Sequence, residues 1–217
     1  MTPFVRHVGI AAALLHHNID TDAIIPSREI RTVGKDGLAH GLFANWRYCD
    51  VATREPEPDF VLNQPQQHGT TILLTGRNFG CGSSREHAVW ALVEWGIRAI
   101  VAPSFGAIFF ENCIRNGIAP VVLPESDVKT LANSVSSDPQ VHLLTVDLMR
   151  RELLGPNGIS HSINLGEEER DQLLTGLDPI GRTLQQHSTQ IEAFEAEDRI
   201  CLPWMYVSTE DYKTTYP

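Results

Sequence analysis

The chain has 217 residues, of which 42% are hydrophobic and 20% charged, a composition that suits one large domain with a packed core. The formal net charge of −10 argues against a surface that binds nucleic acid or anionic lipid, because those partners are themselves negative. No stretch is long and apolar enough to predict a helix that crosses a membrane.

The first predicted element is a strand over Val8–Leu15. This run is apolar and follows Arg6 and His7, so it superficially matches the core of a signal peptide. It is short, it lacks a cleavage site, and an acidic motif follows it. We therefore interpret it as a strand of the folded domain.

The acidic motif is Asn18–Pro26, with the sequence NIDTDAIIP. Acids two positions apart suggest a calcium loop, but Ile24 stands where an EF-hand needs an oxygen ligand. Two interpretations stay open. The motif is either a turn in which Asp20 and Asp22 bind nearby backbone groups, or the rim of an active-site cleft.

Residues 45–69 are rich in Pro, Asn, Asp and Gln, which predicts an irregular arm extending over about residues 27–69. After the arm, three apolar segments alternate with two helical patterns. The predicted strands and helices are Thr71–Thr75, Ser84–Trp95, Arg98–Ala102, Phe105–Asn116 and Ile118–Leu123. This order predicts a largely parallel sheet. Gly96 and Gly117 suit helix C-termini, and Ser104 suits the N-cap of the second helix.

The C-terminal third predicts further short elements. Strands are expected at Val141–Val146 and Ile163–Leu165, and helices at Glu167–Leu174 and Thr183–Glu197. We expect residues 1–203 to form a single domain. Residues 204–217 are polar and aromatic without periodicity, which predicts a C-terminal tail that is mobile or docked on a neighbour.

The segment Gly76–His87, GRNFGCGSSREH, joins a predicted strand to a predicted helix. Such a turn aims free backbone N–H groups and the positive end of the helix at one point. Its spacing differs from the dinucleotide fingerprint, the P-loop and the nucleophile elbow. The remaining interpretation is a site for a small anion, with Ser83, Ser84 and Arg85 directed at carboxylates.

Residues of this turn also have structural interpretations. Ser83 and Glu86 have the S-x-x-E spacing of a capping box, which begins many helices that have no catalytic role. Cys81 lies near a helix N-terminus, where a thiol can become a nucleophile, but a small turn residue is the simpler interpretation. His87 suits a hydrogen-bonded structural residue that supports the site.

The segment Pro103–Cys113 has apolar residues at helical spacing, which are most simply core. Asn112 and Asn116 are candidates to face a site. The four cysteines, at positions 49, 81, 113 and 201, form neither a C-x-x-C pair nor an evenly spaced framework. The sequence therefore predicts no metal site on this chain and a reducing, cytoplasmic compartment.

Together these segments resemble the small subunits of 3-isopropylmalate dehydratase, in the aconitase superfamily. Residues 80–87, GCGSSREH, match that family's serine motif nearly letter for letter, and residues 18–26 are similar to its N-terminal signature. Residues 102–113 resemble its next helix start, and residues 176–184, GLDPIGRTL, its C-terminal signature. The resemblance spans about residues 8–192 and departs from the family pattern at Val89, Ala107 and Arg182.

The resemblance implies an α/β fold, the swivelling β/β/α domain of the aconitase type. It also implies a heterodimer with a separate large subunit that carries a [4Fe-4S] cluster. The family's hydro-lyase reaction isomerises 2-isopropylmalate to 3-isopropylmalate by losing and regaining water in leucine biosynthesis. A related hydro-lyase subunit acting with homoaconitate, citraconate or dimethylmalate, and a non-catalytic carboxylate-binding module, remain alternatives.

The resemblance also implies roles for individual residues. Ser83 would be the base that takes the carbon-bound proton, while Ser84 and Arg85 would bind a substrate carboxylate. Other expected substrate contacts are Asp20, Thr21, Ile30 and Arg31, of which the last two would meet the isopropyl group or its neighbouring carboxylate. The expected anion-binding turn is Gly80, Cys81 and Gly82, and the residues expected to support it are Arg77 and His87.

Overall fold

The computed structural model describes residues 1–30, 34–83 and 85–206. Two predicted site residues, Arg31 and Ser84, and most of the predicted tail therefore lie outside the described residues. The chain divides into two compact units, Met1–Gly176 and Leu177–Pro217, and each is considered by itself. The domain boundary expected at residue 203 remains a prediction.

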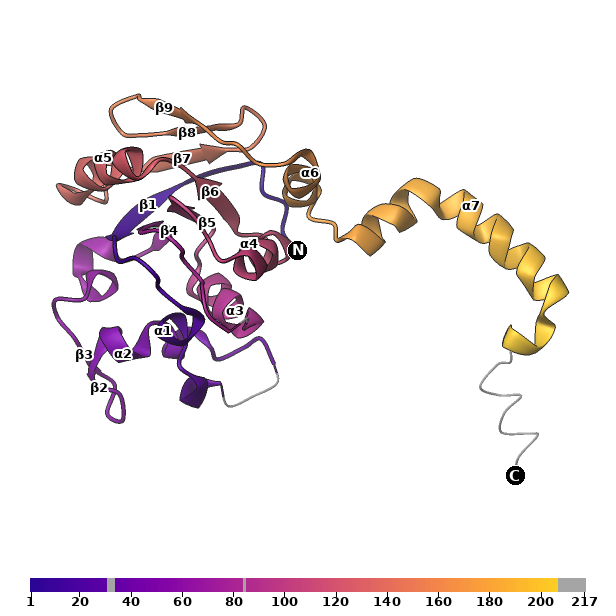
Figure 1. Cartoon of the computed structure of the whole chain (residues 1–217), viewed down its shortest axis with the longest axis horizontal. Coiled ribbons are helices and arrows are strands. Elements are labelled where there is room, and N and C mark those ends of the chain that lie inside the picture. The colour runs from indigo at the N-terminus through magenta and orange to yellow at the C-terminus, as the bar shows by residue number, and fades with distance from the viewer. Residues whose placement is uncertain (31–33, 84, 207–217) are drawn as a thin grey trace. The chain divides into compact units, whose positions relative to one another are not determined.

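A mixed sheet of seven strands forms the centre of the described part of the first unit (Figure 1). Its order is β6-β5-β4-β1-β7-β8-β9. The bounds are β1 Arg6–Leu14, β4 Thr70–Thr75, β5 Ala99–Ala102, β6 Ala119–Val122, β7 Leu144–Asp147, β8 Glu152–Leu154 and β9 Ser160–Ser162. The first three strands in this order pair in parallel, as predicted, and β1 also pairs in parallel with β4. The last three strands are antiparallel additions.

The two faces of the sheet are covered by different helices because strand side chains alternate between the faces. Leu73 and Ile100 pack with the apolar side of α3 (Glu86–Trp95). Ile72, Leu74 and Val101 pack with α5 (Glu125–Ser136) in a second buried cluster. Burying each such side chain contributes roughly 1.5–3 kcal/mol, so both faces stabilise the sheet.

The predicted arm packs into this fold rather than extending from it. Five of its buried apolar side chains join the cluster on the α3 face, and they are Leu38, Leu42, Phe43, Phe60 and Leu62. Its short elements are η1 Ser27–Glu29, η2 Ala39–Gly41, α2 Ala44–Arg47, β2 Tyr48–Asp50, β3 Glu55–Pro56, η3 Val61–Asn63 and η4 Pro65–Gln67. Single apolar residues scattered among polar ones make this packing. The average composition of the segment is polar and therefore does not reveal them.

The predicted helix ends are confirmed, but the predicted N-cap is wrong. Gly96 and Gly117 follow α3 and α4 (Ala107–Asn116) with φ of 107° and 80°, a conformation that favours glycine. The N-cap of α4 is Gly106. Ser104 instead accepts a hydrogen bond at Oγ from the backbone N–H of Asn78, at 2.9 Å.

Predictions for the C-terminal third hold in part. The strand predicted at Ile163–Leu165 is wrong: this segment follows β9 without strand structure, and its two apolar side chains are buried in the α5-side cluster. The strand predicted at Val141–Val146 begins at Leu144, while α6 (Glu167–Thr175) is confirmed. In these cases burial, not strand pairing, explains the apolar residues.

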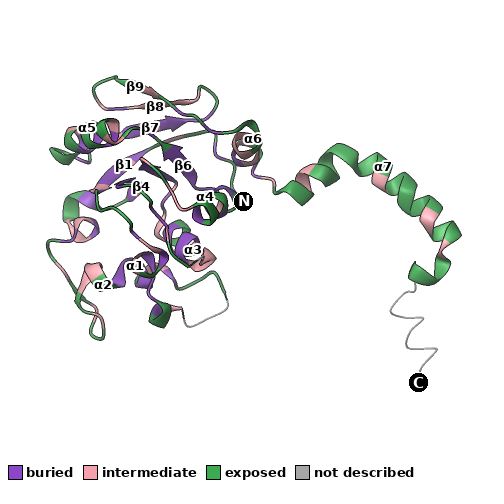
Figure 2. Cartoon of the chain, viewed as in Figure 1, coloured by how far each residue is buried: buried purple, intermediate pink, exposed green. Residues whose placement is uncertain are grey.

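In the second unit, α7 (Pro179–Cys201) contains no buried residue (Figure 2). Its N-cap, Asp178, accepts a hydrogen bond from the N–H of Gly181 at 2.6 Å, and Pro179 suits the first helical position. The helix is interrupted at His187, and η5 (Pro203–Tyr206) follows it. Within the described residues, no helix combines the length and apolar character needed to span a membrane.

Glu94, near the end of α3, fastens the arm to the core. Its carboxylate accepts hydrogen bonds from the backbone N–H groups of Gly37, Leu38 and Ala39, at 2.7, 2.5 and 2.8 Å. Burial acts to raise the pKa of Glu94, but these N–H groups outweigh it and hold the pKa below its usual value.

We expect Glu94→Gln to lower the free energy of unfolding by about 1–2 kcal/mol near neutral pH, a modest value because the side chain is exposed. A carboxyl pKa lowered by folding adds stability above the unfolded-state value of about 4.3. That stability is lost as the pH falls through the lower, folded-state pKa. Urea unfolding should show the difference between wild type and variant shrinking in acid, and a pH-independent difference would contradict this role.

Candidate active site

Three segments that are distant in sequence meet beyond one edge of the sheet. They are residues 18–21, 76–83 and 104–106, which follow β1, β4 and β5. These strands run parallel, so their C-terminal ends share an edge, where ligands of open α/β sheets characteristically bind. The three motifs that the sequence marked separately therefore form one loop cluster.

Backbone hydrogen bonds hold the first two segments together. The N–H of Asn18 donates to the carbonyl of Arg77 at 2.8 Å, and the N–H of Gly80 donates to the carbonyl of Ile19 at 2.7 Å. The N–H of Thr21 donates to the carbonyl of Cys81 at 3.1 Å. The glycine-rich turn is thus paired along its length with the acidic motif.

The third segment closes the cluster from the other side. The N–H of Phe79 donates to the carbonyl of Ser104 at 3.1 Å, and the N–H of Gly106 donates to the carbonyl of Phe79 at 2.9 Å. Asn78, which the sequence analysis did not select, has φ of 59° and its Nδ2 donates to Oδ1 of Asn18 at 2.9 Å. Asparagine tolerates this left-handed conformation, and its place between glycines was the available signal.

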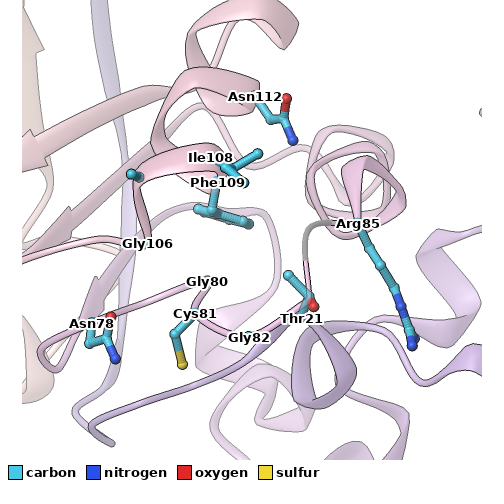
Figure 3. Close-up of a pocket in the computed structure, with 11 residues that line it drawn as sticks. Thr21, Asn78, Gly80, Cys81, Gly82, Arg85, Gly106, Ile108, Phe109 and Asn112 are labelled. Carbon is cyan, nitrogen blue, oxygen red and sulfur yellow. The ribbon is translucent and has the colours of Figure 1, made fainter.

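A pocket of about 300 Å³ opens within this cluster (Figure 3). Arg85 is the one charged side chain among the described residues that line it. The N-cap residues of α3 and α4, Arg85 and Gly106, both line the pocket, and neither helix has a side-chain cap. Two positive helix ends and a guanidinium favour an anionic ligand.

Ser83 directly follows Gly82, which lines the pocket, but Ser83 is not itself among the lining residues, and its side chain is exposed. Its carbonyl accepts a hydrogen bond from Oγ1 of Thr21 at 2.6 Å. Its hydroxyl makes no hydrogen bond with the described residues. Thr21 therefore fixes the backbone of the turn and leaves the Ser83 hydroxyl available.

The capping-box interpretation of Ser83 is wrong. The helix begins at Glu86 with Arg85 as its N-cap, two residues later than predicted. The Glu86 carboxylate accepts a hydrogen bond from Nδ2 of Asn116 at 2.9 Å, so it binds the neighbouring helix α4 rather than the start of its own. Tertiary packing of α3 against α4 overrides the local motif.

Arg85 is held by Asp22 of the acidic motif and by Ser27 directly after it. Its Nη1 donates to Oδ1 of Asp22 at 2.5 Å and to Oγ of Ser27 at 2.7 Å. Nε and Nη2 make no hydrogen bond with the described residues, so these donors remain for a ligand. Figure 3 shows the guanidinium directed away from Asn112.

The turn interpretation of the acidic motif is confirmed for Asp20, while the active-site interpretation stays a prediction. Asp20 is the N-cap of α1 (Thr21–Ile24) and its Oδ1 accepts a hydrogen bond from the N–H of Ala23 at 2.7 Å, which makes it a turn residue. Thr21 is buried and lines the pocket. The motif is a local turn that also contributes Thr21 to the lining of the pocket.

The remaining predicted residues fall in different places. Cys81 lines the pocket, but burial first and the Asp20 carboxylate second raise the pKa of its thiol, which disfavours a thiolate nucleophile. His87 packs on Trp90 with ring centroids 4.8 Å apart. Arg77 lies within 3.4 Å of Glu125, and neither Arg77 nor the half-buried Ile30 lines the pocket.

The described residues contain no group of three or more His, Cys, Asp or Glu that is arranged to hold a metal ion. The four cysteines are unpaired, and Cys113 is fully buried in the α3-side cluster. Burial raises the pKa of the Cys113 thiol well above its usual value, as expected for a core residue.

Comparison with known proteins gives the family. The model of the aconitase C-terminal domain family matches residues 1–126, which include the whole loop cluster. A 3-isopropylmalate dehydratase small subunit from Cupriavidus necator is 57% identical over 206 residues, covering 95% of this chain and 99% of that one. The chain belongs to the 3-isopropylmalate dehydratase small subunits.

Two further relatives support the same family. The 3-isopropylmalate dehydratase small subunit of Methylibium petroleiphilum is 46% identical, over 94% of this chain and 97% of its own length. The crystal structure of 3-isopropylmalate dehydratase from Methanocaldococcus jannaschii aligns with a TM-score of 0.62 at 27% identity, covering 87% of this chain and 99% of that chain. The predicted α/β fold of the aconitase type is thereby confirmed.

Proposed function

We propose that this small subunit, with a separate large subunit in the cytoplasm, isomerises 2-isopropylmalate to 3-isopropylmalate by dehydration and rehydration in leucine biosynthesis. One observation carries the proposal. The Ser83 side chain is exposed and free of the helix cap, and it lies between Gly82 and Arg85 in a turn whose neighbouring pocket has Arg85 as its one charged lining side chain among the described residues. A dicarboxylate fits that charge.

Ser83 would take the carbon-bound proton at Oγ. A free alcohol is essentially un-ionised near neutral pH, and each pKa unit by which the alkoxide is favoured corresponds to about 1.4 kcal/mol. The uncapped N-terminus of α3 and the guanidinium of Arg85 can stabilise the alkoxide and so lower the pKa of the alcohol. Their effect is strongest once a docked partner excludes water. The base is therefore expected to be weak in the isolated chain.

Arg85 would hold one substrate carboxylate through Nε and Nη2 while Nη1 stays on Asp22 and Ser27. Ser84 would bind the same carboxylate, and Ile30 and Arg31 would meet the isopropyl end. The [4Fe-4S] cluster that we assign to the large subunit would supply a Lewis acid that polarises the leaving hydroxyl.

The test is an anaerobic assay of this chain copurified with its large subunit. We expect turnover to be fastest with 2-isopropylmalate and slower with homoaconitate, citraconate and dimethylmalate, and the isolated chain to be folded but inactive. Preference for another of these acids would indicate a different hydro-lyase. Diacid binding by the lone chain, with no activity gained from the large subunit, would indicate a binding module instead.

We expect Arg85→Lys to raise the KM for 2-isopropylmalate by about tenfold to hundredfold, because an ammonium group cannot replace a bidentate guanidinium. Steady-state kinetics of the complex would measure this. Arg115→Lys is the matched control, since Arg115 forms an exposed pair with Glu111 on α4 and its kinetics should not change. Unchanged kinetics for Arg85→Lys would remove Arg85 from the substrate site.

A further inference from the structure

Asn112 is a largely buried residue whose side-chain amide opens onto the pocket without a protein partner. The residue lies on α4, is 6% exposed and lines the pocket beside the glycine-rich turn. Its backbone carbonyl accepts a hydrogen bond from Nδ2 of Asn116 at 2.9 Å. Its side-chain amide makes no hydrogen bond with any described residue, and Figure 3 shows that side chain extending from α4 toward α3.

Such an amide favours a polar ligand. It must hydrogen-bond to water or to a ligand, because a polar group left without any partner costs about 1–3 kcal/mol. A polar residue that opens onto a pocket and lacks a protein partner therefore points to a ligand that supplies the partner. Water would serve in the empty pocket, and a ligand oxygen would replace it.

The start of α4 adds donors beside this amide. Ala107 and Ile108 line the pocket, and their backbone N–H groups have no acceptor among the described residues. Helical side chains lean toward the N-terminus of their helix, so the Asn112 amide covers the turn that begins near Ile108. The amide and the positive end of α4 thus act on the same part of the pocket.

We propose that Asn112 and the first turn of α4 form a second carboxylate-binding subsite, on a different helix from Arg85. The Asn112 NH2 group donates to one carboxylate of a small dicarboxylic acid while Arg85 binds the other. Neutral donors and a helix dipole suit a carboxylate here because no acidic side chain is among the described residues that line the pocket. That the acid is isopropylmalate rests on the proposed function, whereas the subsite requires only a dicarboxylate.

Two variants and one control test the subsite in the complex with the large subunit. Asn112→Leu keeps the volume and removes the unpaired amide, so the melting temperature should be unchanged or higher while the KM for 2-isopropylmalate rises about tenfold to hundredfold. Asn112→Asp should raise the KM further, because a carboxylate repels the substrate. Glu111→Gln, on the exposed side of the same helix, should leave the KM unchanged.

A second measurement does not depend on activity. In ¹H–¹⁵N spectra of the full chain, the Asn112 side-chain NH2 signals, identified by their loss in Asn112→Leu, should shift saturably when 2-isopropylmalate or malate is added. A shift in a chain whose complex isomerises none of the acids would support the subsite and overturn the proposed function. An active complex with an unchanged KM in Asn112→Leu, or NH2 signals that do not move, would overturn the subsite and leave the function standing.

Discussion

Ser83→Ala in the complex with the large subunit is expected to lower kcat about 10²–10⁴-fold, the range typical of a removed general base. The melting temperature and the assembly of the complex should hardly change. Ser83 is exposed and its hydroxyl makes no hydrogen bond with the described residues, so its removal should alter the free energy of unfolding by less than about 0.5 kcal/mol. The loss of activity would then belong to the chemical step.

The matched control is Ser160→Ala, an exposed serine on β9 that does not line the pocket. It should keep the wild-type kcat. Ser83→Thr tests position as well as chemistry, since it retains a hydroxyl on a bulkier side chain. A kcat for Ser83→Ala close to that of wild type would show that another group takes the proton, whatever the effect on KM.

Gly80→Ala is expected to destabilise the fold by about 3–5 kcal/mol and to abolish most activity. Gly80 has φ of +72°, where a Cβ adds about 1–2 kcal/mol of strain. An added Cβ would also lie only 2.1–2.5 Å from three ring atoms of Phe109, a side chain that is 3% exposed. Either the turn or α4 must move, and both line the pocket.

Gly158→Ala separates these two causes. Gly158 has a similar φ of +77°, but an added Cβ would meet nothing within 4 Å. The free energy of unfolding of this control should fall only by the strain energy, about 1–2 kcal/mol, and its activity should be unchanged. Urea unfolding of both variants gives the overlap energy by difference, and equal losses would show that Phe109 is not the obstacle. In a Phe109→Ala background, which lacks the three overlapping atoms, Gly80→Ala should cost only the strain.

Much of the site was predictable because its segments are local patterns. The alternation of apolar and helical periods predicts the parallel strands and α3 and α4, and the glycines at 96 and 117 end the helices as their backbone freedom allows. The order of the parallel strands then places the acidic motif and the glycine-rich turn at one edge. The order of the segments along the chain and their side-chain types are enough to predict these features.

Other features depend on partners far away in the sequence. Asp22 pairs with Arg85 across 63 positions, and Asn116 binds Glu86 across 30, which turns an apparent capping box into a contact between helices. The two acids and the S-x-x-E spacing were visible in the sequence, but their partners were not. Spacing can show only which hydrogen bonds are available locally, and packing decides which ones form.

The sequence by itself determined the alternation of strands and helices over residues 71–123, the position of the glycine-rich turn and the family to which its motifs belong. Only the tertiary structure decided that the arm is buried, that Ser83 is released from the helix cap and that the Asn112 amide faces the pocket without a partner. The physical reason is the distance along the chain between the residues that interact. Helical and strand periods follow from neighbouring residues, whereas burial and hydrogen-bond pairing depend on segments that meet only after the sheet has formed.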